Sequence, residues 1–206
     1  MIIETFDNTT QEVLKELEKT QKQFWNISRT TAEFLYNIIV DSKAKSVVEV
    51  GTSNGYSGIW LGKALKKTGG RLTTIEFYDK RLDVAKENFE KCGVADIIET
   101  KRGDAATILE YLPEDFKIDF AFVDANKSQY IKFFEKFENN LKKSGVIVSD
   151  NLNFHGLTHT KEPIESRNVR GLVRKLNLYI DFLKENTKFN TQFYEIGDGV
   201  SISMKL

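Results

Sequence analysis

Residues 46–58 read SVVEVGTSNGYSG, a short β-branched run followed by a glycine-rich turn and the start of a helix. Valine favours strands because its branched side chain packs well on a pleated surface, and glycine permits the tight turn that follows. Along the rest of the chain, short strand-like runs alternate with longer helical segments. This alternation predicts strand–helix–strand units and a parallel sheet, with ligands bound at the carboxyl ends of the strands.

The other predicted elements follow from hydrophobic periodicity. Before the first strand we expect one helix over Thr9–Trp25 and a second that Ser28 caps. Later helices are expected over Tyr56–Lys67, Asp79–Lys91, Ala105–Tyr111, Gln129–Asn139 and Val169–Leu183. Strands are expected over Ser46–Val50, Arg71–Glu76, Ile97–Lys101, Ile118–Val123, Gly145–Ser149, Thr191–Ile196 and Val200–Met204. The last two flank Gly197-Asp198-Gly199, which predicts an antiparallel hairpin.

The composition is that of one globular domain. The chain has 206 residues, of which 40% are hydrophobic and 29% are charged, close to globular averages. Lysine and arginine number 30 and so do aspartate and glutamate, which disfavours a dedicated binder of duplex DNA. We expect a single domain over residues 1–206, with a helical extension over 1–42 and an α/β core over 43–206.

Cysteine content and apolar runs exclude further classes. Cys92 is the single cysteine, so neither an internal disulfide nor a multi-cysteine zinc site is expected. The N-terminus lacks the basic and apolar regions of a signal peptide, and no apolar run reaches the ~20 residues of a membrane span. We therefore expect a cytoplasmic protein that does not contact membranes.

The glycine-rich turn after the first predicted strand is a candidate ligand-binding loop, although it could be a turn without a ligand. Gly51 and Gly55 have three residues between them, whereas nicotinamide sites use the closer spacing G-x-G-x-x-G. The wider turn suits an amino-acid moiety better than a pyrophosphate. Glu76 ends the second strand, where a carboxylate can accept hydrogen bonds from both hydroxyls of a ribose. Asp104 would lie beside a purine, or could equally cap the next helix.

Acidic and amide side chains follow the fourth and fifth predicted strands. The two segments read VDANK over residues 123–127 and SDN over residues 149–151. Because the carboxyl ends of parallel strands meet at one edge of a sheet, Asp124, Asp150 and Asn151 should converge. Carboxylate and amide oxygens suit hard divalent cations, Mg²⁺ in particular. Lys127 can point into the same crevice; the alternative is two helix-capping aspartates and a solvated lysine.

Three segments, VVEVGTSNGYS, FVDANK and SDNL, carry a family resemblance in their order and spacing. They resemble the metal-dependent S-adenosylmethionine O-methyltransferases, which include the catechol and caffeoyl-CoA enzymes and their bacterial relatives. The resemblance covers nearly the whole chain and implies a Rossmann-like class I methyltransferase fold. That fold is a seven-stranded, mostly parallel sheet with a C-terminal antiparallel hairpin and an N-terminal helical extension. The resemblance also implies a homodimer. Asn126 departs from the pattern, since plant members usually carry an acid there, but it is not a ligand position.

The resemblance also implies roles for single residues. The metal ligands would be Asp124, Asp150 and Asn151, around Mg²⁺ or another divalent cation such as Ca²⁺ or Mn²⁺. The catalytic residues would be Lys127, which takes a proton from the acceptor, and Asp124. S-adenosylmethionine would be bound by Glu49, Gly51, Ser57, Glu76, Asp104, Ala105 and Asp124. Together these residues predict methyl transfer to a vicinal-dihydroxy, catechol-type small molecule.

Other functions stay open at this point. Bacterial relatives methylate 5-hydroxyuridine at the wobble position of tRNA, and the closing segment here is similar to theirs. A basic set near one helix could grip phosphates or form a solvated face; its members are Arg167, Arg170, Arg174 and Lys175. A non-catalytic S-adenosylmethionine-binding protein is disfavoured by the intact acidic set. Residues 152–166, with His155 and His159, are expected to form a loop over the crevice that lines the substrate.

Overall fold

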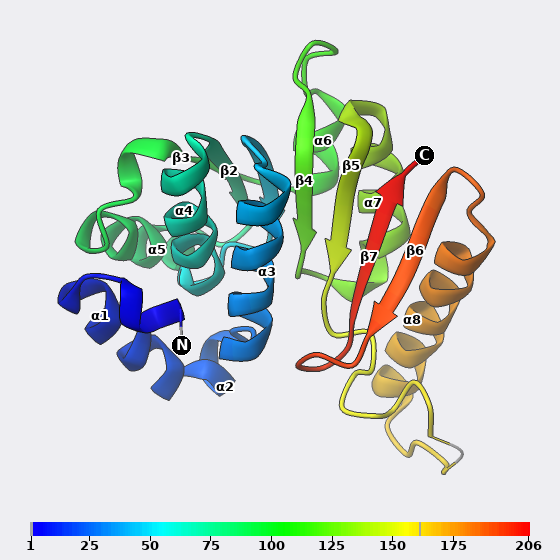
Figure 1. Ribbon diagram of the computed structural model, residues 1–206. Coiled ribbons are helices and arrows are strands. Elements are labelled where there is room, and N and C mark those ends of the chain that lie inside the picture. The colour runs from blue at the N-terminus through cyan, green and yellow to red at the C-terminus, as the bar shows by residue number, and fades with distance from the viewer. Residues whose placement is uncertain (1, 161) are drawn as a thin grey trace. The chain divides into compact units, whose positions relative to one another are not determined.

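The computed structural model describes residues 2–160 and 162–206 (Figure 1). The chain forms two compact units, one ending at Ile108 and one covering Leu109–Leu206. The strands form a seven-stranded sheet in the order β3-β2-β1-β4-β5-β7-β6. The predicted mostly parallel sheet with a C-terminal antiparallel hairpin is therefore confirmed.

The first unit holds β1, β2 and β3, which pair in parallel. Its strands are β1 (Ser46–Val50), β2 (Arg71–Glu76) and β3 (Ile98–Arg102). Its helices are η1 (Ile2–Thr5), α1 (Asn8–Lys19), α2 (Gln21–Phe24), α3 (Arg29–Ser42), α4 (Tyr56–Thr68), α5 (Asp79–Lys91), η2 (Ala95–Ile97) and α6 (Ala105–Glu110), whose end continues into the second unit. The β-branched run that predicted β1 is buried, with Val47, Val48 and Val50 at most 2% exposed.

The second unit holds the remaining strands. Its elements are β4 (Ile118–Val123), η3 (Lys127–Gln129), α7 (Tyr130–Asn140), β5 (Leu141–Ser149), α8 (Arg167–Glu185), β6 (Phe189–Tyr194) and β7 (Val200–Lys205). Strands β4 and β5 pair in parallel, whereas β7 pairs antiparallel with both β5 and β6. Strand β4 is buried on both faces, as its apolar sequence predicts. The ends of β4 and β5 therefore lie side by side.

Most sequence-based boundaries lie within two residues of the observed ones, but two do not. The single helix expected over Thr9–Trp25 is broken at Thr20, where the backbone turns to φ −100° and ψ 12°. The Thr20 hydroxyl donates to the carbonyl of Leu17 at 3.0 Å, a local bond that competes with helix continuation. The fifth strand begins at Leu141 and not at Gly145, because Leu141 already pairs with Ile118.

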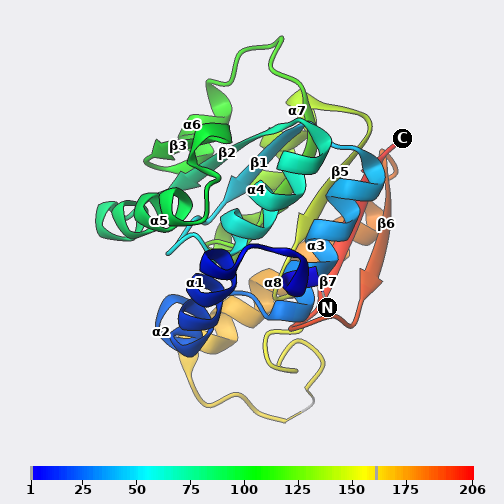
Figure 2. The same cartoon turned by 60° about the vertical axis from the view of Figure 1, so that its left-hand side comes forward.

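The N-terminal helices belong to the first unit. The Ser28 hydroxyl accepts a hydrogen bond from the Thr31 amide and caps α3 as predicted. Helix α1 packs against α5 (Figure 2), and the ring of Phe6 contacts Tyr36 and Trp60.

No helix within residues 2–160 and 162–206 is long and apolar enough to cross a membrane.

Candidate functional site

The glycine-rich loop of the first unit joins β1 to α4. Gly51, Ser53 and Gly55 have φ angles of 105°, 48° and 86°, a left-handed region that glycine adopts at little cost. A Cβ atom on Gly55 would lie 2.8 Å from the Phe89 ring, so only glycine fits against α5. The Gly51 amide donates to the carbonyl of Ile75 on β2 at 3.0 Å. The loop is thus a tight turn held against its neighbours.

Glu76 fastens the end of β2 to this loop. Its side chain is nearly buried, at 6% exposure. The Ser53 amide donates to Oε2 at 2.8 Å, and the Tyr78 amide donates to Oε1 at 2.9 Å. Each carboxylate oxygen can accept a second hydrogen bond. This geometry leaves acceptor capacity for a ligand's hydroxyls, and the ribose role of Glu76 stays a prediction.

The predicted residues Glu49 and Ser57 lie beside the loop in a buried environment. Glu49 is 0% exposed and Ser57 is 8% exposed. The hydroxyl of Thr74 on β2 donates to Oε2 of Glu49 at 2.6 Å. Thr52, in the loop, forms a hydroxyl–hydroxyl bond of 2.5 Å with the same threonine. These contacts join β1, β2 and the loop into one polar network.

Asp104 serves as a helix cap. Its Oδ1 accepts hydrogen bonds from the Thr107 amide at 2.9 Å and from the Thr107 hydroxyl at 3.0 Å. The capping role that the sequence left open is therefore confirmed. Ala105, the first residue of α6, is 9% exposed. A position for both residues beside adenine stays a prediction.

The second unit brings the predicted metal-binding and catalytic side chains together. The Asp150 amide donates to the carbonyl of Val123 at 3.1 Å and continues the pairing of β4 with β5 beyond their ends. Nζ of Lys127 donates to Oδ1 of Asn151 at 2.7 Å and lies 3.5 Å from Oδ1 of Asp124. Residues from two strand ends thus meet at one ammonium group.

The two carboxyl groups of Asp124 and Asp150 are close to each other, and Lys127 is the cation that contacts Asp124. Asp150 is 1% exposed, and within the described part of the chain its Oδ1 has no hydrogen-bond partner. Burial and the nearby charge of Asp124 raise the pKa of the Asp150 carboxyl well above its ordinary value. Burial also raises the pKa of Asp124, although Lys127 opposes this. Buried carboxylates of this kind are stabilised by a bound cation.

The donor set fits a hard divalent cation. Over residues 2–160 and 162–206, no three His, Cys, Asp or Glu side chains gather as a metal site, so a cation here would need a third protein donor of another type. The amide oxygen of Asn151 could be this third donor, because Nζ of Lys127 contacts both Asn151 and Asp124. An unpartnered carboxylate oxygen, a second carboxylate and an amide oxygen form an all-oxygen set of the kind that Mg²⁺ prefers.

Tyr130 also contacts this site, although it was not among the predicted site residues. Its hydroxyl donates to the carbonyl of Asp150 at 3.2 Å, and its ring centroid lies 5.7 Å from Nζ of Lys127. Burial and the charges of Asp124 and Asp150 raise the pKa of Tyr130 well above its ordinary value. Its place at the start of α7, three residues after Lys127, is the feature of the sequence that could have indicated it.

The hairpin turn between β6 and β7 has a role that the sequence did not predict. The amides of Leu152 and Asn153 donate to the carbonyls of Gly199 at 2.9 Å and Asp198 at 2.8 Å. The His155 amide donates to Oδ1 of Asp198 at 2.6 Å. The turn between β6 and β7 therefore holds the segment that directly follows Asn151.

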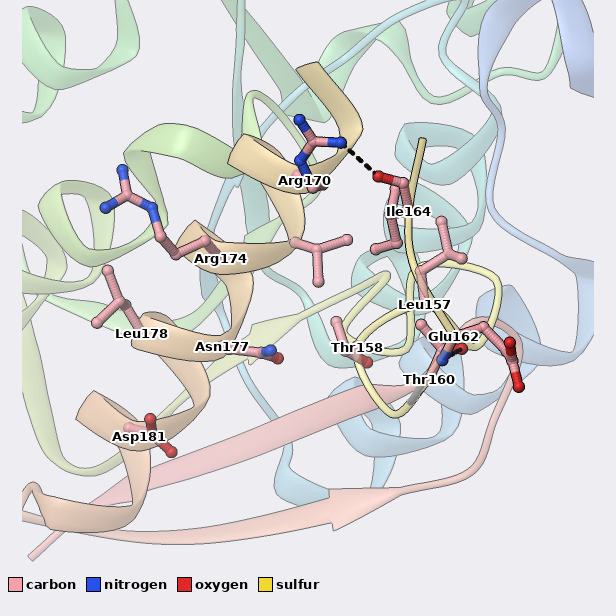
Figure 3. A pocket seen from close by; sticks show the side chains of 11 residues that line it. Leu157, Thr158, Thr160, Glu162, Ile164, Arg170, Arg174, Asn177, Leu178 and Asp181 are labelled. Carbon is pink, nitrogen blue, oxygen red and sulfur yellow. Dashed lines mark hydrogen bonds between the residues drawn. The ribbon is translucent and has the colours of Figure 1, made fainter. Parts of the chain in front are cut away.

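The described parts of the segment between β5 and α8, 152–160 and 162–166, form a loop as expected, and its place over the crevice beside the substrate stays a prediction. With α8 the loop lines an open, shallow surface pocket of about 420 Å³ (Figure 3). Nη1 of Arg170 donates to the carbonyls of Ile164 at 2.6 Å and Glu165 at 2.8 Å. One member of the predicted phosphate-binding set thus holds the loop. The side chain of His155 is 73% exposed and faces Asp198.

A family model described as O-methyltransferase matches residues 4–206. The chain belongs to the O-methyltransferase family. It is 32% identical over 213 residues to caffeoyl-CoA O-methyltransferase 1 of Eucalyptus globulus, with 95% of this chain and 82% of that protein covered. It is 33% identical over 129 residues to a catechol O-methyltransferase of Niastella koreensis, with 62% and 58% covered.

A solved structure of similar fold is the O-methyltransferase from Bacillus cereus in complex with SAH. It has a TM-score of 0.82 and 25% sequence identity, with 97% of this chain and 91% of that chain covered. The predicted Rossmann-like methyltransferase fold and the predicted O-methyltransferase enzyme are confirmed.

Proposed function

We propose that this enzyme transfers the methyl group of S-adenosylmethionine to one hydroxyl of a vicinal-dihydroxy, catechol-type small molecule, with the help of a divalent cation. The observation that carries the proposal is the set of oxygen donors around Lys127. This lysine contacts both Asp124 and Asn151, and Asp150 beside them has a buried, unpartnered carboxylate oxygen among the described residues. A helix-capping or surface role explains none of these contacts.

The first unit would bind the cofactor. S-adenosylmethionine supplies an electrophilic methyl group on a sulfonium. Glu76 would accept hydrogen bonds from its ribose, because both carboxylate oxygens are already oriented by backbone amides. Gly51 and the buried residues Glu49 and Ser57 would lie along its amino-acid part, and Asp104 and Ala105 beside its adenine. The SAH complex of the Bacillus cereus relative supports this choice of cofactor.

The second unit would bind the cation. Asp124, Asp150 and Asn151 would hold Mg²⁺, with Mn²⁺ and Ca²⁺ as candidates of the same ligand preference. A bound divalent cation polarises an acceptor hydroxyl and lowers its pKa. The protein's own contribution is to keep two carboxylates and an amide oxygen in place before the cation arrives. The contact between the Asp150 amide and Val123 and the bond from Tyr130 do this.

Lys127 would act as the general base. Its Nζ would accept the proton that the acceptor hydroxyl releases, a role that contributes roughly 10²–10⁴-fold to rate in enzymes. Contacts with Asn151 and with the Tyr130 ring hold this nitrogen in place. S-adenosylmethionine would supply the methyl group, which would pass to the deprotonated acceptor oxygen as its bond to sulfur breaks. Alignment of the two reactants supplies much of the remaining acceleration.

Named relatives support an acceptor with two adjacent hydroxyls. Caffeoyl and catechol rings both carry such a pair, and the matching relatives are a caffeoyl-CoA and a catechol O-methyltransferase. Methylation of tRNA stays a prediction without a specific observation in its favour, since Arg170 is engaged with the loop. The homodimer and the cytoplasmic location also stay predictions.

Mass spectrometry of methyl transfer tests the proposal. The full chain is incubated with S-adenosylmethionine, Mg²⁺ and either a panel of catechols or bulk unmethylated tRNA. We expect a gain of one methyl group on the catechols, and monohydroxy analogues should stay unmodified. Methyl transfer to tRNA with none to any catechol would overturn the choice of acceptor.

A further inference from the structure

The helices that precede β1 contact the glycine-rich loop at two points. The Tyr56 hydroxyl donates to Oε1 of Glu18, on α1, at 2.8 Å. The Ser53 hydroxyl donates to the carbonyl of Phe24, on α2, at 2.8 Å. The Ser53 contact starts from the loop between β1 and α4, and the Tyr56 contact starts from the first residue of α4. The N-terminal extension and this loop are therefore joined by specific bonds as well as by packing.

Glu18 is held in place by a second partner. Nε of Arg29 donates to its Oε1 at 2.9 Å, and Nη2 donates to its Oε2 at 2.5 Å. Paired guanidinium–carboxylate bonds of this kind fix orientation as well as supply energy. The bonds from Arg29 and Tyr56 lower the pKa of Glu18 despite its partial burial. Burial and the Glu18 charge raise the pKa of Tyr56, so its hydroxyl stays protonated and donates.

The loop side of these contacts leads to the proposed cofactor residues. Ser53 has the left-handed φ angle of 48°, an uncommon conformation for a side chain that carries a Cβ. Its amide donates to Oε2 of Glu76 at 2.8 Å while its hydroxyl donates to Phe24. Tyr56, which is 1% exposed, begins α4 directly after Gly55. The extension thus contacts the middle of the turn, at Ser53, and the residue that directly follows it, Tyr56.

The extension has a separate anchor that does not involve the loop. The Phe6 ring packs on Trp60 at 5.1 Å between centroids, and Nζ of Lys63 lies 2.7 Å from Oδ2 of Asp7. These contacts reach the middle of α4. Loss of the bond between Tyr56 and Glu18 should therefore leave the extension attached and the fold intact.

We propose that Glu18 is a positioning residue for the cofactor. Its bond with Tyr56, together with the bond from Ser53 to Phe24, keeps the glycine-rich loop in the conformation that binds the cofactor. The inference rests on the proposed function, because it takes the loop as the S-adenosylmethionine site. Coupling between two sites is reciprocal. A bound cofactor should therefore also stabilise α1 and α2.

Binding of S-adenosylhomocysteine to the full chain, measured by calorimetry, tests the inference. Tyr56→Phe removes only the hydroxyl, and Glu18→Ala removes its acceptor. Each should weaken binding about tenfold, the equivalent of one hydrogen bond to a charged group. Glu18→Gln keeps an acceptor for Tyr56 and should recover most of the affinity. In turnover, the two disruptive variants should raise KM for S-adenosylmethionine with kcat within about twofold of wild type.

Tyr36→Phe is the matched control. Tyr36 is 3% exposed, and within residues 2–160 and 162–206 its hydroxyl has no hydrogen-bond partner. This variant should bind S-adenosylhomocysteine as tightly as wild type does. Hydrogen exchange adds a readout independent of turnover. The ligand should slow exchange of the amides in α1 and α2 in wild type, and this protection should shrink in Tyr56→Phe.

The outcomes distinguish a failure of the positioning role from a failure of the proposed function. Wild-type affinity in Tyr56→Phe and Glu18→Ala, or equal loss in the Tyr36→Phe control, would overturn the positioning role and leave the proposed function standing. Failure of the wild-type chain to bind S-adenosylhomocysteine would overturn the proposed cofactor, and the positioning role with it.

Discussion

The ammonium of Lys127 lies 2.7 Å from the side-chain oxygen of Asn151, although the two residues are 24 positions apart. One residue follows β4 and the other follows β5, and Asn151 has a left-handed φ angle of 61°. The contact is possible because the ends of two parallel strands lie side by side. It places the proposed general base and a proposed cation ligand within hydrogen-bond distance.

Replacement of Lys127 by methionine should lower kcat about 10²–10⁴-fold, because the variant has no group to accept the acceptor's proton. S-adenosylhomocysteine should still bind within about twofold of wild type, since the glycine-rich loop is untouched. Steady-state kinetics and calorimetry measure the two effects. Lys127→Arg is the control: it keeps the positive charge but cannot be deprotonated. Substantial activity in the arginine variant would exclude the role of general base.

Asp150→Asn should stabilise the protein in EDTA by at least about 1 kcal/mol, or about 2–4 °C in Tm. The change removes a buried charge that Asp124 repels. Mg²⁺ should raise the Tm of wild type and not that of the variant, because only the wild type gains a ligand for its unpartnered oxygen. Thermal unfolding in EDTA and in Mg²⁺ gives both values. A lower Tm of the variant in EDTA would show that the carboxylate is already compensated.

Asp198→Ala should destabilise the chain by about 0.5–1.5 kcal/mol, because the solvent-exposed His155 amide exchanges this acceptor for water. Gly199→Ala should cost at least as much, since a Cβ there would lie 2.9 Å from the Asn153 backbone nitrogen. Urea unfolding measures both, and proteolysis within residues 152–160 should become faster. Unchanged stability in both variants would mean that the hairpin turn does not hold this segment.

Burial raises the pKa of the Cys92 thiol to about 11. The neutral thiol is therefore favoured in the folded state, and its contribution to stability, present below the ordinary thiol pKa, is lost as the pH rises through about 11. At pH 8 the native protein should react with a thiol-specific reagent at least about 100-fold more slowly than the urea-unfolded chain. Comparable rates in the two states would show that Cys92 is accessible.

Local sequence patterns predicted most of the fold and the convergence of side chains at the ends of β4 and β5. The apolar run of β4 and the acidic residues after it follow from strand burial, and the convergence of Asp124 with Asn151 follows from parallel pairing. The bond between His155 and Asp198 did not follow, because it joins residues 43 positions apart through a hairpin turn. The break at Thr20 depends on one side-chain hydroxyl bond, which hydrophobic periodicity does not detect.

Methyl transfer by the wild-type enzyme with and without a chelator tests the proposed chemistry most directly. With S-adenosylmethionine, a catechol and Mg²⁺, product should accumulate; excess EDTA should reduce the rate at least about 100-fold, and added Mg²⁺ should restore it. Undiminished turnover in excess EDTA would contradict a role of Asp124, Asp150 and Asn151 as ligands of a catalytic cation.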